Sequence, residues 1–320
     1  MKKNLVSILI TNYNKSGYLN RSINSCLKQN FNNKEILVFD DCSTDDSLKI
    51  LNKFKKIKII KNKKKKFKSG PLNQIYGLHK LFKISKGNII FLLDSDDIFK
   101  KNKLSEINKI FKKNKKIDVL INNAGIYGPK GSSETLNWNE WKNTLDINLL
   151  GSIYMTNKII PHFKKKRYGK IIQISGGGAA SAFPFFSPYS VSKVGIVRFI
   201  ENISIELKKY NIYANSIAPG PVNTRMLDQV LKAGPKKVGK TFFQKSIKQK
   251  KQGGTDINKV LNLIEFLAHK KSDKISGKLI SALWDNWEVF SKNKKKLNSS
   301  DFGNLRRITG RERNLKFFDK

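Results

Sequence analysis

The chain has 320 residues, 39% of them hydrophobic, which is enough for one large α/β domain or two smaller ones. Lysine and arginine total 64 against 24 acidic residues, so the formal net charge at pH 7 is +40. The excess is nearly all lysine and is spread along the chain, and its densest run, residues 63–66, has no interleaved aromatic residues, so we expect a solvated surface and no specific nucleic-acid partner. No apolar run approaches the length of a transmembrane segment, and Cys26 and Cys42 lack metal-binding spacing. These features predict a cytoplasmic protein.

Short apolar strand patterns alternate with amphipathic helical patterns along the chain. This alternation predicts a doubly wound, Rossmann-like α/β fold with a mostly parallel sheet and helices on both faces. The expected strands cover residues 6–11, 35–40, 57–61, 88–93, 118–122, 170–175, 212–218 and 278–282. The expected helices cover residues 18–29, 46–54, 72–84, 103–113, 138–166, 188–209 and 256–268. We expect two half-domains to build one extended sheet, with two abutting subdomains as the alternative.

Polar residues follow three of the strands expected in the first half. "TNYN" begins at Thr11, "FDDCSTD" contains Asp41, and "DSDD" covers residues 94–97. Because the carboxyl ends of parallel strands meet at one edge of a sheet, these residues are expected to converge on one crevice. Clustered carboxylates are suited to Mg²⁺ or Mn²⁺, which can bridge a diphosphate; the alternative is that they cap the following helix.

Residues 1–117 resemble the donor-binding half of a family-2 glycosyltransferase of the GT-A type. The resemblance implies a nucleotide-sugar site, with Thr11, Tyr13 and Asp41 at the uridine. It also implies that Asp94 reaches the ribose and that Asp96 reaches the diphosphate-bound metal. The family's second half, with its acceptor pocket and catalytic carboxylate, has no counterpart after residue 117, so we expect binding of a nucleotide sugar rather than transfer.

The most informative pair in the second half is Tyr189 and Lys193. Four residues apart in an expected helix, they share one face. A lysine ammonium can lower a phenol's pKa from about 10 toward neutral pH, and such a tyrosine can exchange a proton with an alcohol or ketone during hydride transfer. The alternative is an exposed face in a lysine-rich chain. A preceding Ser/Gly-rich loop, "NNAG" at 122–125 and "PGPVNT" at 219–224 favour the catalytic interpretation.

Residues 118 to about 312 resemble a short-chain dehydrogenase/reductase that lacks its first third, with 118–290 as the catalytic part and 291–320 as a basic tail. The resemblance implies NAD or NADP as the cofactor and a small-molecule substrate. It implies a homodimer or homotetramer formed through the helices at 138–166 and 188–209. The implied catalytic residues are Asn148, Tyr189 and Lys193, with Ser175 as the nearest hydroxyl. The implied cofactor-binding residues are Asn122, Ala124, Gly125, Pro219, Gly220, Val222 and Thr224.

Two departures from this family matter. The substrate-orienting serine usually stands 13 residues before the tyrosine, where this chain has Gly176; Ser175 lies one residue early, and Ser181 is a weaker substitute. The family's TGxxxGxG turn, which lets the backbone approach the cofactor pyrophosphate at a helix N-terminus, is also missing. The corresponding turn, "TNYNKSGYL" from Thr11, has no glycine at the required places. We therefore expect weak cofactor binding.

Three hypotheses follow from a join between Ile117 and Asp118. The first is an oxidoreductase in which Asp40 or Asp41 holds the adenosine ribose. The second is a nucleotide-sugar and metal binder that uses the "DSDD" cluster. The third is a fusion product without enzymatic activity. The oxidoreductase leads because its resemblance covers more of the chain.

Overall fold

The structure, a computed structural model, describes residues 5–66, 70–87, 89–114, 116–309 and 311–314. The chain divides into two compact units, Met1–Lys116 and Ile117–Lys320. Each unit contains a parallel four-stranded sheet with helices on both faces, so the predicted doubly wound α/β class is confirmed.

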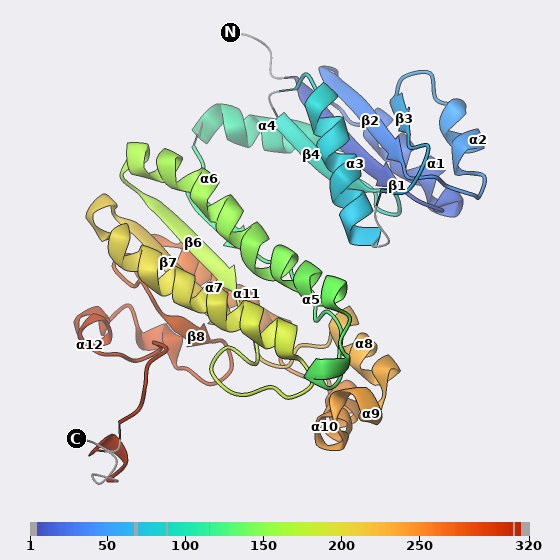
Figure 1. Ribbon diagram of the computed structural model, residues 1–320. Coiled ribbons are helices and arrows are strands. Elements are labelled where there is room, and N and C mark those ends of the chain that lie inside the picture. The colour runs from blue at the N-terminus through green and yellow to red at the C-terminus, as the bar shows by residue number, and fades with distance from the viewer. Residues whose placement is uncertain (1–4, 67–69, 88, 115, 310, 315–320) are drawn as a thin grey trace. The chain divides into compact units, whose positions relative to one another are not determined.

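The first unit has strands in the order β3-β2-β1-β4 (Figure 1), all parallel. Neighbouring positions on β1 face opposite sides of the sheet: Ile8 packs with α1, α2 and α4, whereas Leu9 packs with α3. Its strands are β1 (Val6–Asn12), β2 (Lys34–Asp40), β3 (Lys58–Lys61) and β4 (Ile89–Asp94). Its helices are α1 (Ser16–Leu27), α2 (Ser47–Asn52), α3 (Gly70–Ile84) and α4 (Lys103–Asn114). Asn88, predicted to start the fourth strand, lies outside the described residues.

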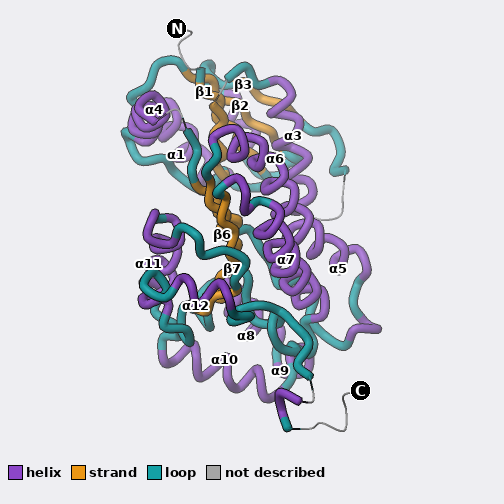
Figure 2. The backbone as a smooth tube through the Cα atoms, turned by 90° about the vertical axis from the view of Figure 1, so that its left-hand side faces the viewer, coloured by secondary structure: helices purple, strands orange, loops and turns teal. Residues whose placement is uncertain are grey.

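The second unit has parallel strands in the order β5-β6-β7-β8. Figure 2 shows α6 and α7 on one side of these strands and α11 on the other. On β6, Ile171 accordingly packs with α6 and α7, and Ile172 packs with α11. The strands are β5 (Val119–Asn122), β6 (Gly169–Ile174), β7 (Ile212–Ala218) and β8 (Leu279–Ser281). The helices are α5 (Trp138–Leu145), α6 (Gly151–Lys166), α7 (Ser187–Glu206), α8 (Arg225–Ala233), α9 (Pro235–Val238), α10 (Lys240–Gln252), α11 (Ile257–Ala268) and α12 (Lys294–Ser299).

The expectation of one extended sheet is wrong. Hydrogen bonds join β1–β4 into one sheet and β5–β8 into another, and no ladder joins the two sheets within the described residues. Apolar periodicity specifies which faces of a strand are buried, whereas edge pairing depends on contacts between distant segments. The sequence pattern therefore predicted the strands but not where one sheet ends.

Two predicted helices differ in the structure. The helix expected at 138–166 is interrupted by a π-helical segment at Asp146–Leu150. The helix expected at 188–209 ends as α7 at Glu206 and is followed by a 3₁₀ turn, Lys208–Tyr210. Helices α8, α9, α10 and α12 were not predicted. Helices α9 and α12 are short, at four and six residues, and lysines interrupt the apolar pattern of α10, whereas α8 has a clear amphipathic pattern that was missed.

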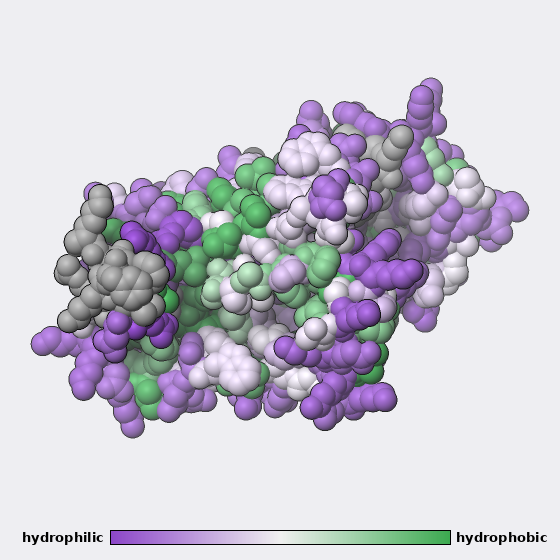
Figure 3. Space-filling view, turned by 60° about the horizontal axis from the view of Figure 1, so that its bottom comes forward, coloured by the Kyte–Doolittle hydropathy of each residue, from purple (hydrophilic) through white to green (hydrophobic). Residues whose placement is uncertain are grey.

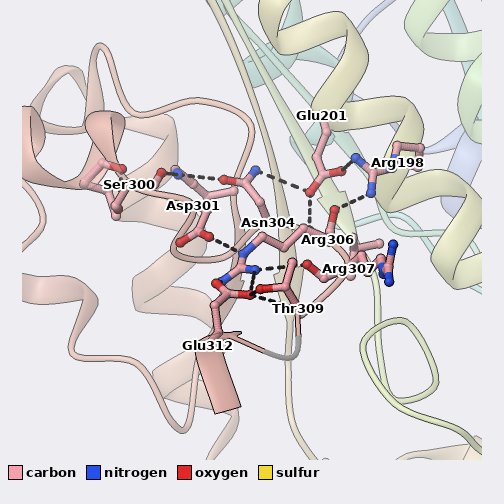
Figure 4. A network of polar contacts seen from close by, with 12 residues as sticks. Arg198, Glu201, Ser300, Asp301, Asn304, Arg306, Arg307, Thr309 and Glu312 are labelled. Atoms are coloured by element: carbon pink, nitrogen blue, oxygen red, sulfur yellow. Dashed lines mark hydrogen bonds and ion pairs between the residues drawn. The ribbon is translucent and has the colours of Figure 1, made fainter. Parts of the chain in front are cut away.

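The basic tail packs on its own unit through a network of polar contacts (Figure 4). The Gly303 carbonyl accepts a hydrogen bond from the Leu279 amide at 2.7 Å, which covers part of the outer edge of β8. Asn304 Nδ2 donates to the Gly277 carbonyl at 2.7 Å, and the Leu305 amide donates to Glu201 Oε1 at 2.7 Å. Residues 315–320 of the tail lie outside the described residues. Among the helices that the structure describes, none combines the length and apolarity needed to cross a membrane.

Candidate functional site

A cavity of about 1150 Å³ opens at the carboxyl ends of the strands in the second unit. Its lining includes the segments that follow β5, β6 and β7, together with side chains from α7, α8, α10 and α11. The face drawn in Figure 3 shows hydrophobic residues gathered toward its middle, with hydrophilic residues around them. Strand ends of a parallel sheet are where ligands bind in this fold class.

Tyr189 and Lys193 both line this cavity from the first two turns of α7. Their side chains are buried, at 6% and 4% exposed, although this chain carries most of its lysines on its surface. Lys193 Nζ lies 5.5 Å from the centre of the Tyr189 ring and donates a hydrogen bond to the Ile174 carbonyl at 3.0 Å. The structure therefore brings the predicted pair to the end of β6.

The electrostatics of the pair differ from the expectation. Burial lowers the pKa of Lys193 to about 8. Burial, with a smaller contribution from Tyr127, raises the pKa of Tyr189 well above its usual value. Desolvation of the phenolate therefore outweighs the attraction of the nearby ammonium. The phenol is therefore protonated at neutral pH, and its raised pKa makes it a weaker acid than an exposed tyrosine.

Asn148 is fully buried in the π-helical segment 146–150. Its Oδ1 accepts from the Ile126 amide at 2.8 Å, while Nδ2 donates to the Ile126 carbonyl at 2.8 Å and to Ser192 Oγ at 3.0 Å. Asn148 thus ties the loop after β5 to α7 beside Tyr189. A π-helical segment inside a helix is frequent at functional sites.

Residue 176, where the family usually has its substrate-orienting serine, is a glycine and carries no hydroxyl. A Cβ added to Gly176 would overlap the Tyr189 hydroxyl, so this residue lies against the tyrosine as the resemblance implies. The neighbouring Ser175 lines the cavity, and its buried Oγ has no hydrogen-bond partner within the described part of the chain. Ser181 is exposed at the cavity wall. The orphaned Ser175 hydroxyl is a polar group that a bound ligand would satisfy.

The residues predicted near the cofactor divide into two groups. Asn122 is buried and donates to Thr156 Oγ1 at 2.9 Å, which fixes the end of β5 against α6. Ala124 is exposed outside the cavity lining. Gly125 lines the cavity, and a Cβ there would lie 3.5 Å from Lys193 Nζ. The bare backbone at Gly125 therefore leaves room for a ligand beside the lysine.

Four more of these residues follow β7, and all four line the cavity: Pro219, Gly220, Val222 and Thr224. Gly220 has φ +80°, a left-handed conformation that glycine adopts without strain. Val222 forms a β-bridge with Gly254, and Thr224 caps α8 by accepting from the Met226 amide at 3.3 Å. These contacts hold the turn in place beside the cavity.

The second unit thus fits the reacting end of a nicotinamide cofactor, with bare backbone at two glycines and an orphaned hydroxyl around a buried lysine. In the first unit, the start of helix α1 is occupied by a side chain of the same unit. The Ser16 amide donates to Asp45 Oδ2 at 2.9 Å. Although burial opposes it, hydrogen bonds from Ser47 and Ser16 lower the pKa of Asp45 to about 2. This permanent carboxylate occupies the helix terminus where a phosphate would bind.

Asp40 and Asp41 are both buried, which limits their use for a ribose. Asp40 accepts from Asn12 Nδ2 at 2.8 Å and from Ser43 Oγ at 2.6 Å. Asp41 Oδ1 accepts from Asn62 Nδ2 at 2.7 Å. These hydrogen bonds join the loops that follow β1, β2 and β3.

The predicted nucleotide-sugar residues lie at strand ends of the first unit. Thr11 on β1 pairs in register with Asp94 on β4. Tyr13 is exposed, and Lys65 Nζ lies 3.4 Å from the centre of its ring. Asp41, the fourth predicted residue, directly follows the neighbouring strand β2, so the structure brings the four to one edge of the sheet.

The carboxylates of the "DSDD" cluster have partners from the protein. Asp94 Oδ1 accepts from Gln74 Nε2 at 2.7 Å, and Asp96 forms an ion pair with Lys15 at 2.7 Å. Burial, then the charges of Asp96 and Asp97, raises the pKa of Asp94. No group of three potential metal ligands occurs in the ranges that the structure describes. A metal at Asp96 would have to displace Lys15.

Three aromatic residues at the site were not predicted: Tyr127, Phe183 and Phe242. Their rings and that of Tyr189 form a set of edge-to-face contacts, for example 4.8 Å between Tyr127 and Tyr189. The "FPFF" run at 183–186, directly before the helix of the tyrosine, is the one sequence signal for this cluster.

Comparison with known proteins identifies two parts. A family model described as short chain dehydrogenase matches residues 83–234, and one described as glycosyltransferase like family 2 matches residues 3–123. The 3-oxoacyl-(acyl-carrier-protein) reductase FabG of Buchnera aphidicola subsp. Schizaphis graminum is 31% identical over 194 residues, which are 61% of this chain and 74% of that protein. The chain therefore belongs to the short-chain dehydrogenase family, with an N-terminal part similar to family-2 glycosyltransferases.

Other relatives are matched over less of their length. Dehydrogenase/reductase SDR family member 4 of Sus scrofa is 27% identical over 51% of this chain and 57% of that protein. The human protein of the same name is 36% identical over 34% of this chain and 39% of that protein. The crystal structure of levodione reductase is 15% identical, with a TM-score of 0.49 and coverage of 89% of this chain and 98% of that chain.

Proposed function

We propose that the chain is an NAD(P)-dependent oxidoreductase that interconverts a carbonyl compound and its alcohol. The observation that carries this proposal is the buried Tyr189–Lys193 pair in a cavity at the strand ends. In the reducing direction one hydride and one proton add to the carbonyl group, which becomes an alcohol, and the reduced dinucleotide becomes oxidised. A reduced nicotinamide dinucleotide supplies the hydride when bound.

The chain's own residues do the remaining work. The Tyr189 phenol, which lines the cavity beside Lys193, donates the proton to the carbonyl oxygen. Lys193 holds its charge next to the tyrosine and faces the space that Gly125 leaves open. Asn148 positions α7 through Ser192. The Ser175 hydroxyl is the free donor nearest in sequence to Gly176 and is assigned to orient the substrate.

The cofactor is NAD or NADP, bound at its nicotinamide end by the residues after β5 and β7. We expect its affinity to be low, because the chain lacks the family's glycine-rich TGxxxGxG turn. The two free cysteines fit the reducing cytoplasm, where we place the protein. Exposed apolar residues on α6 and α7, among them Tyr154, Met155 and Val194, support pairing of two copies through these helices.

The proposal is tested with Tyr189→Phe. We expect this variant to lose turnover of a ketone panel with NADH or NADPH by about 10²-fold or more, because the proton donor is removed, while cofactor fluorescence titrations stay unchanged. Tyr18→Phe, at an exposed position on α1, is the matched control and should keep full activity. Turnover by Tyr189→Phe at the wild-type rate would disprove the assignment.

A second function, nucleotide-sugar binding by the first unit, is favoured by the three carboxylates at the end of β4 and by the family match over residues 3–123. A divalent cation would relieve the repulsion between the carboxylates of Asp94, Asp96 and Asp97. We expect Mg²⁺- or Mn²⁺-dependent binding of UDP in calorimetry, lost in Asp96→Ala and kept in Asp46→Ala, which alters an exposed carboxylate. If neither function is measurable, the remaining hypothesis is a fusion product without enzymatic activity.

A further inference from the structure

The wall of the cavity next to Tyr189 is aromatic. Tyr127 and Phe183 make edge contacts with the tyrosine ring, at 4.8 and 6.3 Å between centres, and Phe242 packs on Phe183 at 4.9 Å. All four rings line the cavity, which continues along Met226 and other apolar residues of α8. A group bound beside the Tyr189 hydroxyl therefore meets ring edges and hydrocarbon.

The start of helix α10, which carries Phe242, packs closely against the ring of Phe185. Gly239 directly precedes α10 with φ +81°, and a Cβ there would lie 2.9 Å from the ring of Phe185. Phe185 itself has φ +68°, and its carbonyl accepts from the Gly131 amide at 3.0 Å. An aromatic residue in this conformation is strained, so the surrounding contacts must specify it. Phe242 is thus a positioned part of the wall.

The cavity has almost no charge, in contrast to the rest of the molecule. The chain has 64 lysines and arginines, yet Lys193 and Asp285 are the two charged residues among the described residues that line the cavity. Lys193 donates to the Ile174 carbonyl and lies on the side of Gly125, where a Cβ would stand 3.5 Å from its Nζ, and Asp285 Oδ2 accepts from the Ser281 amide at 2.8 Å. The wall formed by Tyr127, Phe183 and Phe242 itself contributes no charged side chain, so an anionic group placed against this wall would leave water without an ion-pair partner from the wall.

Physical chemistry then discriminates between substrate classes. A carboxylate or phosphate that binds against this aromatic wall loses its hydration and gains no ion pair from the wall in exchange. This desolvation is costly in a low-dielectric site. An aromatic or hydrocarbon group gains about 25 cal/mol for each Å² of apolar surface that it buries. We propose that the substrate is an uncharged carbonyl compound with an aromatic or hydrocarbon body, and that Phe242 is a specificity-determining residue. This inference rests on the proposed oxidoreductase function.

The test measures binding of a matched pair of ketones to the full chain, 2-acetylnaphthalene and its carboxylated analogue 6-acetyl-2-naphthoic acid, by calorimetry with oxidised dinucleotide present so that no turnover occurs. We expect the neutral ketone to bind at least about ten-fold tighter than the acid. Phe242→Ala should weaken the neutral ketone by about ten-fold or more and leave the acid unchanged. Phe82→Ala, which removes an exposed ring from α3, is the matched control.

The outcomes separate the two proposals. If no ketone is turned over but the neutral ketone binds and Phe242→Ala weakens it, the oxidoreductase proposal fails and the apolar site stands. Equal binding of acid and neutral ketone, no binding of the neutral ketone, or no effect of Phe242→Ala overturns the inference. Phe242→Leu keeps an apolar side chain, so an intermediate affinity for this variant confirms that the ring, rather than a loss of folding, is responsible.

Discussion

At the candidate site, the Tyr189 hydroxyl lies where a side chain on residue 176 would stand. Because residue 176 is glycine, the hydroxyl occupies the volume where a serine Cβ would stand in the family's usual arrangement. The spacing of 13 residues predicted which residue faces the tyrosine, but the overlap between the two groups follows only from the coordinates. The same holds for the phenol's pKa, which burial raises although a lysine stands one turn away.

Gly176→Ala tests this arrangement. The added methyl group overlaps the Tyr189 hydroxyl, so we expect the ring to shift and turnover to fall by about ten-fold or more, since displaced reacting groups lose rate steeply. Gly177→Ala is the control, because a Cβ at that position has nothing within 4 Å. Steady-state kinetics of both variants, with circular dichroism to verify folding, give the answer. Equal activities of the two variants would contradict it.

At the scale of elements, β6 is anchored by a charged residue in its core. Lys170 is 1% exposed; its Nζ donates to the His269 carbonyl at 2.9 Å and to Ser272 Oγ at 2.6 Å, and pairs with Asp273 at 2.8 Å. This cluster connects the start of β6 to the segment after α11. The strand pattern alone predicts Lys170 as an ordinary strand residue and says nothing of these partners, which lie about a hundred positions further along the chain.

Replacing Lys170 with Met should lower the free energy of unfolding by about 2–4 kcal/mol, because two acceptors and a partly buried carboxylate lose their partner. Lys250→Met breaks an exposed ion pair with Asp228 and should cost less than about 1 kcal/mol. Urea denaturation of both variants checks the difference. A similar, small cost for both would show that the buried cluster does not stabilise the strand.

At the scale of the whole molecule, each unit has its own hydrophobic core, and all four tryptophans lie in the second unit. Tryptophan fluorescence therefore reports unfolding of the second unit, whereas circular dichroism reports both. This distribution allows the stability of each unit to be followed in the intact chain.

We expect two cooperative transitions in urea. Leu9→Ala, in the core of the first unit, should lower the free energy of unfolding of that unit by about 2–5 kcal/mol. This change should appear in the circular dichroism transition of the first unit and leave the fluorescence midpoint unchanged. Ile217→Ala, in the core of the second unit, should shift the fluorescence midpoint. If Leu9→Ala moves the fluorescence midpoint by as much as Ile217→Ala does, the chain unfolds as one unit.

The sequence by itself determined the strands, most of the long helices, the fold class and the family. These features depend on local periodicity and on short motifs such as "NNAG" and the tyrosine–lysine pair. Each of these motifs spans only a few residues. The same patterns predicted which residues line the cavity at Gly125 and after β7, because the carboxyl ends of parallel strands always face one edge of the sheet.

Only the tertiary structure decided the rest. Two separate sheets, the aromatic wall with Phe242, the carboxylate of Asp45 on the first helix and the near absence of charge in the cavity all depend on segments far apart in the chain. Burial, and with it the cost of desolvating a charge, is a property of the assembled fold and not of a short sequence motif. For this reason the sequence predicted a hydride-transfer chemistry, whereas the apolar and aromatic lining of the cavity could be described only from the structure.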